Sequence, residues 1–179
     1  MCERILIENG APTLANIKTA SLFTLPVLEE KSEVSWKKIL QSKGIEIMIL
    51  RANGKSQLVY IYRPEKLRQD LAHPMATCIL CRAGYKHQTE KEALQILKER
   101  IAHSGEFPHE IGLFLGYPPE DVQGFMENRG KNWKCTGCWK VYGSRKQAEK
   151  QFARYKKCRD VYLRLFLQGR SLTQLTVAS

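Results

Sequence analysis

The sequence contains no long uninterrupted apolar run and none of the common catalytic motifs. No window approaches the roughly 18 uncharged apolar residues of a membrane-spanning helix, and the start has no basic region followed by an apolar stretch. We therefore expect a cytoplasmic protein that does not bind membranes. Gly-x-Ser-x-Gly, a phosphate-binding glycine-rich loop and His-Glu-x-x-His are also absent, which removes support for the common hydrolases, nucleotide hydrolases and metalloproteases.

Cysteine is also sparse. The six cysteines in 179 residues are too few for a disulfide framework. Hydrophobic residues make up 43% of the sequence and charged residues 26%, which is typical of a globular domain with a buried core. No repeat, low-complexity linker or change in composition divides the sequence, so we expect a single domain over residues 1–179.

Acidic residues are nearly missing from one part of the chain. Residues 131–170 include twelve basic residues but only Glu149 and Asp160 as acids, so this segment carries +10 of the formal net charge of +11. Such segregation is typical of an anion-binding surface, although a solvated helix gives the same count when the acids lie elsewhere.

Local patterns predict an α+β fold with a central sheet of about four or five strands and flanking helices. Asn53-Gly54 separates two apolar runs and predicts an antiparallel hairpin over 45–63. The pattern Thr89-x-x-Glu92 predicts a capping box at the start of a helix. Further helices are expected over 13–18, 34–42, 65–71, 74–84 and 118–130, and further strands over 21–25, 110–116 and 132–142.

The longest helix is expected to begin after Ser144 and to end near Gln168, with apolar side chains on one face and cations on another. Aromatic residues lie just before it in the sequence, so phosphate contacts and a stacking surface are expected together. The candidate anion-binding residues are Lys146, Lys150, Arg154, Lys157, Trp139 and Lys140.

Two Cys-x-x-Cys pairs suggest an alternative, a metal or thiol site. We expect Cys78 and Cys81 to pack as small apolar side chains on a helix, because 53 residues separate Cys81 from Cys135, far more than the usual gap in a zinc site. The second pair lies beside lysines, whose positive charge favours thiolates. With one further cysteine and either His103 or His109 it forms a candidate metal set of Cys135, Cys138, Cys158 and His109.

His109 and Glu110 are neighbours where the expected strand over 110–116 begins. A histidine and a carboxylate that face one cleft can serve as acid and base. Adjacent residues of a strand point to opposite faces, so we do not expect a dyad here.

Several stretches of the sequence together resemble a known family. The most specific is FPHEIGLFLGYP over residues 107–118, and the others are 11–15, 21–23, 62–67, 121–122, 124–125, 139–143 and 155–159. Over nearly the whole chain they resemble the domain of unknown function numbered 3793, found mainly in anaerobic Gram-positive bacteria. The resemblance implies no assigned reaction. It does imply a link to iron or redox metabolism, because genes of this family often lie near genes for ferrous-iron transport and flavodoxin.

We therefore expect a non-enzymatic binding or regulatory module that recognises an anionic ligand, a nucleotide or nucleic acid, through residues 131–170. The alternative is a metal- or thiol-dependent protein of iron or redox metabolism that uses Cys135 and Cys138.

Overall fold

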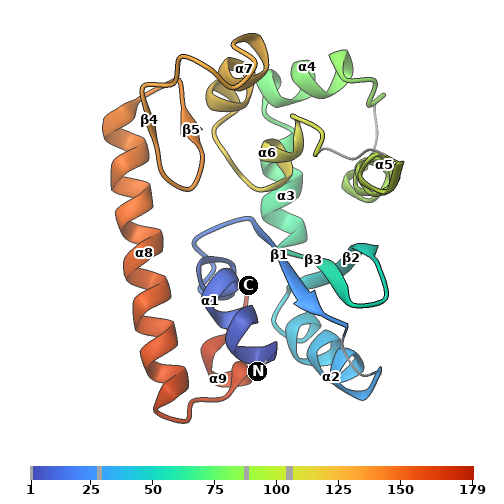
Figure 1. Cartoon of the computed structure of the whole chain (residues 1–179), viewed down its shortest axis with the longest axis vertical. Helices are drawn as coiled ribbons and strands as arrows, with labels where there is room; N and C mark the ends of the chain where they lie inside the picture. Colours follow the sequence, from blue (N-terminus) through green and yellow to red (C-terminus); the bar gives the residue numbers. More distant parts are fainter. Residues whose placement is uncertain (1, 28–29, 87–88, 104–106) are drawn as a thin grey trace. The chain divides into compact units, whose positions relative to one another are not determined.

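The fold is α+β, as predicted. The computed structural model describes residues 2–27, 30–86, 89–103 and 107–179, in which the five strands divide between a three-stranded antiparallel sheet and a two-stranded hairpin (Figure 1). The chain splits into two compact units: unit 1 contains Met1–Pro64 and Tyr155–Ser179, and unit 2 contains Glu65–Arg154. The expected single domain over residues 1–179 stays a prediction. No helix of the described residues has both the length and the apolar character to cross a membrane.

The sheet of unit 1 consists of β1 (Ala20–Pro26), β2 (Glu46–Ala52) and β3 (Ser56–Tyr62), with β3 in the centre. The predicted hairpin between β2 and β3 is confirmed. Its turn is closed by Asn53, whose side-chain oxygen accepts a hydrogen bond from the Ser56 amide at 2.8 Å, and Gly54 adopts a φ of +81° that favours glycine.

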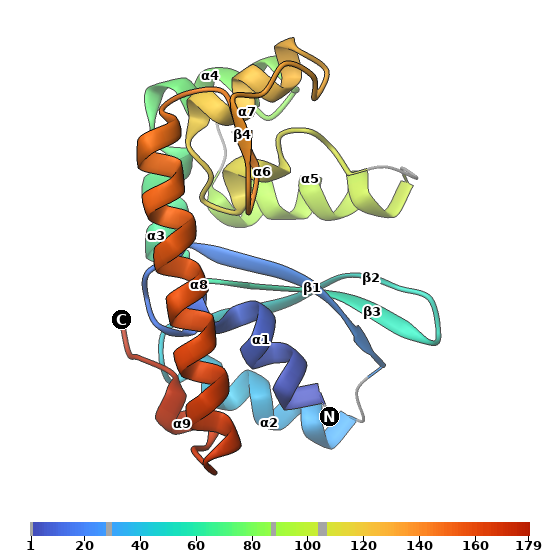
Figure 2. The same ribbon diagram turned by 60° about the vertical axis from the view of Figure 1, so that its left-hand side comes forward.

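Helices α1 (Cys2–Leu14) and α2 (Glu30–Gln41) cover one face of this sheet, as Figure 2 shows. The expected helix over 13–18 is wrong, because the helix lies almost entirely upstream of it. Pro12 misled the prediction, because a proline usually marks the start or the end of a helix, whereas here it lies inside the last turn of α1. Apolar residues recur at helical spacing before it. The core between helices and sheet contains Leu6, Ile7, Leu14, Phe23, Trp36, Leu40, Val59 and Ile61.

Arg63 directly follows β3 and is only 1% exposed. Its guanidinium donates to the carbonyl oxygens of Thr13 at 2.8 Å and Leu14 at 3.0 Å. It also donates to the Val177 carbonyl at 2.7 Å and to the Ser179 hydroxyl at 2.9 Å. Among the described residues no carboxylate forms an ion pair with it. Desolvation lowers the pKa of Arg63, so backbone dipoles hold this buried charge.

Unit 2 contains α3 (Pro64–Leu71, which starts at the last residue of unit 1), α4 (Pro74–Arg82), α5 (Glu90–His103), α6 (Ile111–Phe114) and α7 (Pro119–Glu127). These are followed by β4 (Cys135–Thr136), β5 (Lys140–Val141) and the first part of α8 (Arg145–Leu167).

Two strand predictions in unit 2 are wrong. Residues 110–116 contain the short helix α6, because a short buried apolar run does not distinguish a helix from a strand by its periodicity. Gly112 allows α6 to approach α7 closely, since an added Cβ would lie 2.8 Å from a methyl group of Val122. Residues 132–142 form two short strands with a turn at Gly137 in place of one strand.

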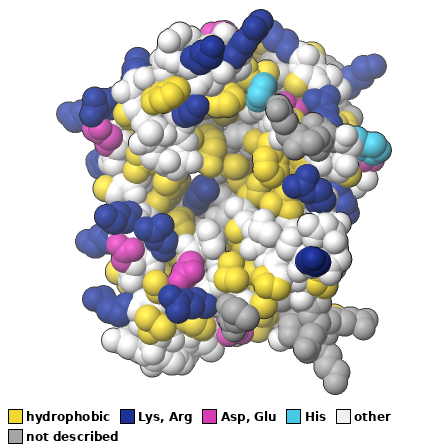
Figure 3. Space-filling view, viewed as in Figure 1, with side chains coloured by type: hydrophobic (Ala, Val, Ile, Leu, Met, Phe, Trp, Pro, Cys, Tyr) yellow, Lys and Arg dark blue, Asp and Glu magenta, His cyan; other side chains and the backbone are white. Residues whose placement is uncertain are grey.

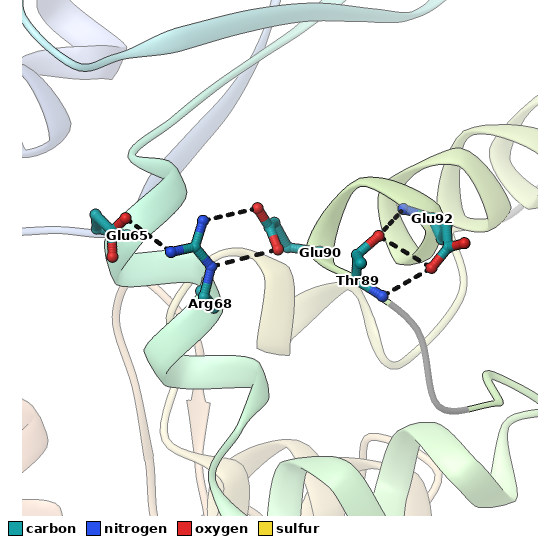
Figure 4. A network of polar contacts seen from close by, with 5 residues as sticks. All are labelled: Glu65, Arg68, Thr89, Glu90 and Glu92. Atoms are coloured by element: carbon teal, nitrogen blue, oxygen red, sulfur yellow. Dashed lines mark hydrogen bonds and ion pairs between the residues drawn. The ribbon is translucent and has the colours of Figure 1, made fainter.

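A polar network joins α3 to α5 within unit 2 (Figure 4). Arg68 donates to Glu65 at 2.7 Å and to Glu90 at 3.0 Å, and its hydrogen bonds hold the pKa of Glu90 below its usual value. The predicted capping box is confirmed: the Thr89 amide donates to the Glu92 carboxylate at 2.8 Å, and the Glu92 amide donates to the Thr89 hydroxyl at 3.3 Å.

Replacement of Arg63 tests its role in unit 1. We expect Arg63→Met to lower the free energy of unfolding by about 3 kcal/mol, because three backbone carbonyl oxygens each lose a hydrogen bond from a charged donor. Urea unfolding followed by circular dichroism measures the change. The control is Arg51→Met, at an exposed position of β2, where we expect a change within about 0.5 kcal/mol. Equal stability of the two variants would contradict the assignment.

Candidate functional site

The predicted long helix is present as α8, from Arg145 to Leu167. The Ser144 hydroxyl accepts a hydrogen bond from the Gln147 amide at 3.4 Å and so caps the first turn. Gly169, with a φ of +90°, follows its last turn. The side chains expected on its apolar face are all buried or half-buried: Ala148, Phe152, Tyr155, Tyr162, Leu165 and Phe166.

Five cations form a second face of α8, which we call the basic stripe: Lys146, Lys150, Arg154, Lys157 and Arg164. All five are exposed. At 3.6 residues per turn they lie within about 80° of one another around the helix axis, and they extend over about 27 Å along it. In Figure 3, Lys and Arg side chains gather along the left-hand edge, over α8.

Carboxylates do not neutralise the basic stripe. The two acidic residues of α8 pair with cations outside it: Glu149 lies 2.7 Å from Arg145, and Asp160 lies 3.7 Å from Arg159. Among residues placed by the structure, no ion pair involves a member of the stripe. Its positive charge therefore faces solvent, where an anion can approach.

Trp139 and Lys140 do not lie on this helix but in the β4–β5 hairpin. The Trp139 ring stacks on Tyr117 with 4.8 Å between ring centroids, and it meets the Phe152 ring of α8 edge to face with 4.6 Å between centroids. Gly137 permits this packing, because an added Cβ would overlap the Phe152 ring. Trp139 thus anchors the hairpin to the first part of α8.

Asp121, in the first turn of α7, holds the hairpin residues on both sides of β5. It is 4% exposed and accepts three hydrogen bonds: from Trp139 Nε1 at 2.7 Å, from the Tyr142 amide at 2.8 Å and from the Gly143 amide at 2.7 Å. Both carboxylate oxygens are used, one by the indole and the other by the backbone. The carboxylate is therefore an internal acceptor that positions β5.

Lys140 is half-buried, and its ammonium group lies among aromatic rings. Nζ donates to the Gly130 carbonyl at 2.8 Å and lies 4.2 Å from the centroid of Trp133 and 5.7 Å from that of Phe125. An ammonium group has three N–H donors, so one hydrogen bond leaves donor capacity at this position.

Next to Lys140 is a cavity of about 310 Å³, which we call the aromatic pocket. It brings Trp139, Lys140 and His109 together, three residues that the sequence assigned to two different sites. Figure 3 shows hydrophobic side chains at the surface over α6, which forms part of its wall. The lining residues are Phe107, Pro108, His109, Ile111, Gly112, Tyr117, Asp121, Val122, Phe125, Trp139 and Lys140.

His109 and Glu110 diverge, as expected, although no strand separates them. The exposed His109 ring lies 5.3 Å from the Phe125 ring, edge to face. Glu110 is buried and accepts hydrogen bonds from Arg100 at 2.7 Å and from the Tyr85 hydroxyl at 3.1 Å. Desolvation, reinforced by the Glu110 charge, raises the pKa of Tyr85. Glu110 therefore connects α5 to the start of α6.

The cysteines are distributed differently from the expectation. Cys78 and Cys81 are on α4, as predicted, but both are exposed, so the expected packing is wrong. The side chains that α4 buries are Ala76, Ile79 and Leu80.

Of the candidate metal set, Cys135 and Cys138 lie in the β4–β5 hairpin, His109 is in the same unit, and Cys158 lies in the part of α8 that belongs to unit 1. Within the described ranges, no three His, Cys, Asp or Glu side chains are grouped so that they could hold a metal ion. The four-residue set stays a prediction.

A family model described as "Protein of unknown function (DUF3793)" matches residues 6–176. The chain belongs to this family. No curated protein and no solved structure matches the sequence. Membership in DUF3793 confirms the resemblance and covers both units, so the basic stripe and the aromatic pocket both lie inside the matched region.

Sequence reasoning missed Tyr117, Asp121 and Phe125 as members of a site. Their only signal was that they belong to the stretches that carry the family resemblance. Hydrophobic and turn patterns do not reveal them, because the pocket forms only when α6, α7 and the β4–β5 hairpin pack together.

Asp121→Asn tests how the hairpin is held. An asparagine amide nitrogen cannot accept a hydrogen bond, so at least one of the three donors loses its acceptor, and we expect a loss of about 2 kcal/mol of stability. Urea unfolding and the hydrogen-exchange rate of the Trp139 indole N–H measure the effect. Glu120→Gln is the matched control, at an exposed position in the same turn of α7. Unchanged stability together with unchanged indole exchange in Asp121→Asn would rule out the proposed anchor.

Proposed function

We propose that this DUF3793 protein is a non-enzymatic binding module that holds the phosphate backbone of a nucleic acid against the basic stripe. One observation carries the proposal: five exposed cations share one face of α8, while both acidic residues of the helix pair with other cations. Phosphate contacts from Lys and Arg supply most of the affinity in sequence-independent binding. A cytoplasmic location is part of this proposal.

The length of the stripe favours a polymer over a mononucleotide. Cations spread over about 27 Å cannot all contact one nucleotide, whereas a duplex presents a phosphate about every 1.7 Å along its axis. The contacts are to phosphates, so the proposal includes no preference for base sequence.

The test is the salt dependence of binding to a fluorescent DNA duplex of about 20 base pairs, measured by anisotropy. Five phosphate contacts give a slope of log affinity against log salt of about −4.5, and loss of three of them reduces its magnitude by about 2.7. We therefore expect Lys150→Gln/Arg154→Gln/Lys157→Gln to bind much more weakly at low salt and to depend less on salt.

The matched control removes three positive charges elsewhere, in Lys37→Gln/Lys38→Gln/Lys91→Gln, whose side chains are exposed on α2 and α5. It has the same net charge as the stripe variant, so we expect only a small loss of affinity. Equal affinities of the two variants, or no binding of the unmodified protein at about 50 mM salt, would refute the proposal.

A second candidate is metal or thiol chemistry of iron or redox metabolism at Cys135 and Cys138. The supporting observation is that both lie in one tight β-hairpin, a local arrangement that supplies two ligands to a metal in many zinc sites. Two thiolates do not complete a site, so the remaining ligands would come from elsewhere.

Metal analysis of the purified protein tests this candidate. We expect Cys135→Ser/Cys138→Ser to lose most of the bound zinc or iron, because both hairpin ligands are removed. Cys78→Ser/Cys81→Ser removes an equally spaced, exposed pair on α4 and should leave the metal content unchanged. Metal-free unmodified protein, or equal loss in both variants, would count against a hairpin site.

A further inference from the structure

The aromatic pocket has the dimensions and lining of a small-molecule site. Its volume of about 310 Å³ is at the lower end of the range for ligand pockets, which suits a ligand with one or two rings. Tyr117, Phe125 and Trp139 contribute flat aromatic side chains to its wall, and Phe107, also in the wall, is 44% exposed. Planar ligands bind well to such walls, because aromatic rings stack face to face with an offset or meet edge to face.

The polar groups of the pocket determine which charge it accepts. Among the lining residues that the structure describes, Asp121 is the one carboxylate, and its two oxygens already accept three internal hydrogen bonds. Lys140 keeps donor capacity, and the exposed His109 contributes an imidazole. The wall therefore offers hydrogen-bond donors and positive charge, which match an anionic group.

We propose that the aromatic pocket binds a small aromatic carboxylate, with its ring among the aromatic side chains and its carboxylate at Lys140 and His109. Lys140 is half-buried and its ammonium group lies beside two aromatic rings, which strengthens its attraction for a carboxylate relative to a fully exposed lysine. This site uses no residue of the basic stripe, so the proposal goes beyond nucleic-acid binding, and a negative result for one site does not affect the other.

The first experiment titrates the unmodified protein with 2-naphthoate and with benzoate, and follows backbone amide shifts by NMR. We expect saturable binding with a Kd of about 1 mM or below, and shifts concentrated in residues 107–125 and 139–140. The uncharged 2-naphthamide has nearly the same shape and should bind about tenfold more weakly, because it lacks the charge that Lys140 contacts.

Variants locate the site and distinguish the contribution of the Lys140 charge to binding from that of the space in the pocket. Lys140→Met should weaken 2-naphthoate binding about tenfold and leave 2-naphthamide unchanged, whereas Lys140→Arg, which keeps the charge, should retain the preference for the acid. Ile111→Trp places a large side chain in the wall of the pocket and should abolish binding of both probes. Lys134→Met is the control, since Lys134 is exposed outside the pocket and donates to Gly143.

Circular dichroism and thermal unfolding establish that each variant is folded before it is titrated. The proposal is overturned if 2-naphthoate shows no saturable binding, if acid and amide bind equally well, or if Ile111→Trp still binds both probes. It is also overturned if folded Lys140→Met binds 2-naphthoate as tightly as the unmodified protein does.

Discussion

Unit 1 depends on a buried guanidinium that is held by backbone carbonyl groups. The unit is assembled from two distant stretches of chain, and Arg63 joins them by hydrogen bonds to Thr13 and Leu14 on one side and to Val177 and Ser179 on the other. Only arginine combines five donors in a planar group with a charge that persists despite burial. A neutral apolar side chain here would remove the charged hydrogen bonds that link the two stretches, so the closure of unit 1 depends on this guanidinium.

Unit 2 contains a buried charge of the opposite sign, the carboxylate of Asp121. Asp121 accepts from one indole and two backbone amides, as Arg63 donates to backbone carbonyls. In both cases neutral dipoles compensate a buried charge, so neither residue offers its charge to a ligand. This explains why the pocket can contain a carboxylate in its wall and still present the donors of Lys140 to a ligand. The position of Trp139, and with it the shape of the pocket, follows from the Asp121 contacts.

Local signals predicted the parts of the fold that local interactions determine. The Asn53-Gly54 turn, the Thr89–Glu92 capping box and the Ser144 cap each need only a few neighbouring residues, and all three are confirmed. Helix α6 and the exposure of Cys78 depend on what packs against them, which the sequence pattern does not contain. The pocket was invisible for the same reason: Trp139, Lys140 and His109 were identified singly, but only tertiary packing places them around one cavity.

The two proposed anion sites differ in the physics of their charges. The basic stripe is exposed, so its attraction is screened beyond about 8 Å at physiological ionic strength and weakens steeply as salt is added. Lys140 is half-buried among aromatic rings, where water and ions screen a contact much less. A polyanion gains from many weak, salt-sensitive contacts, whereas a small acid depends on one strong contact and on the fit of its ring. Added salt should therefore separate the two activities in one protein sample, because it weakens the first far more than the second.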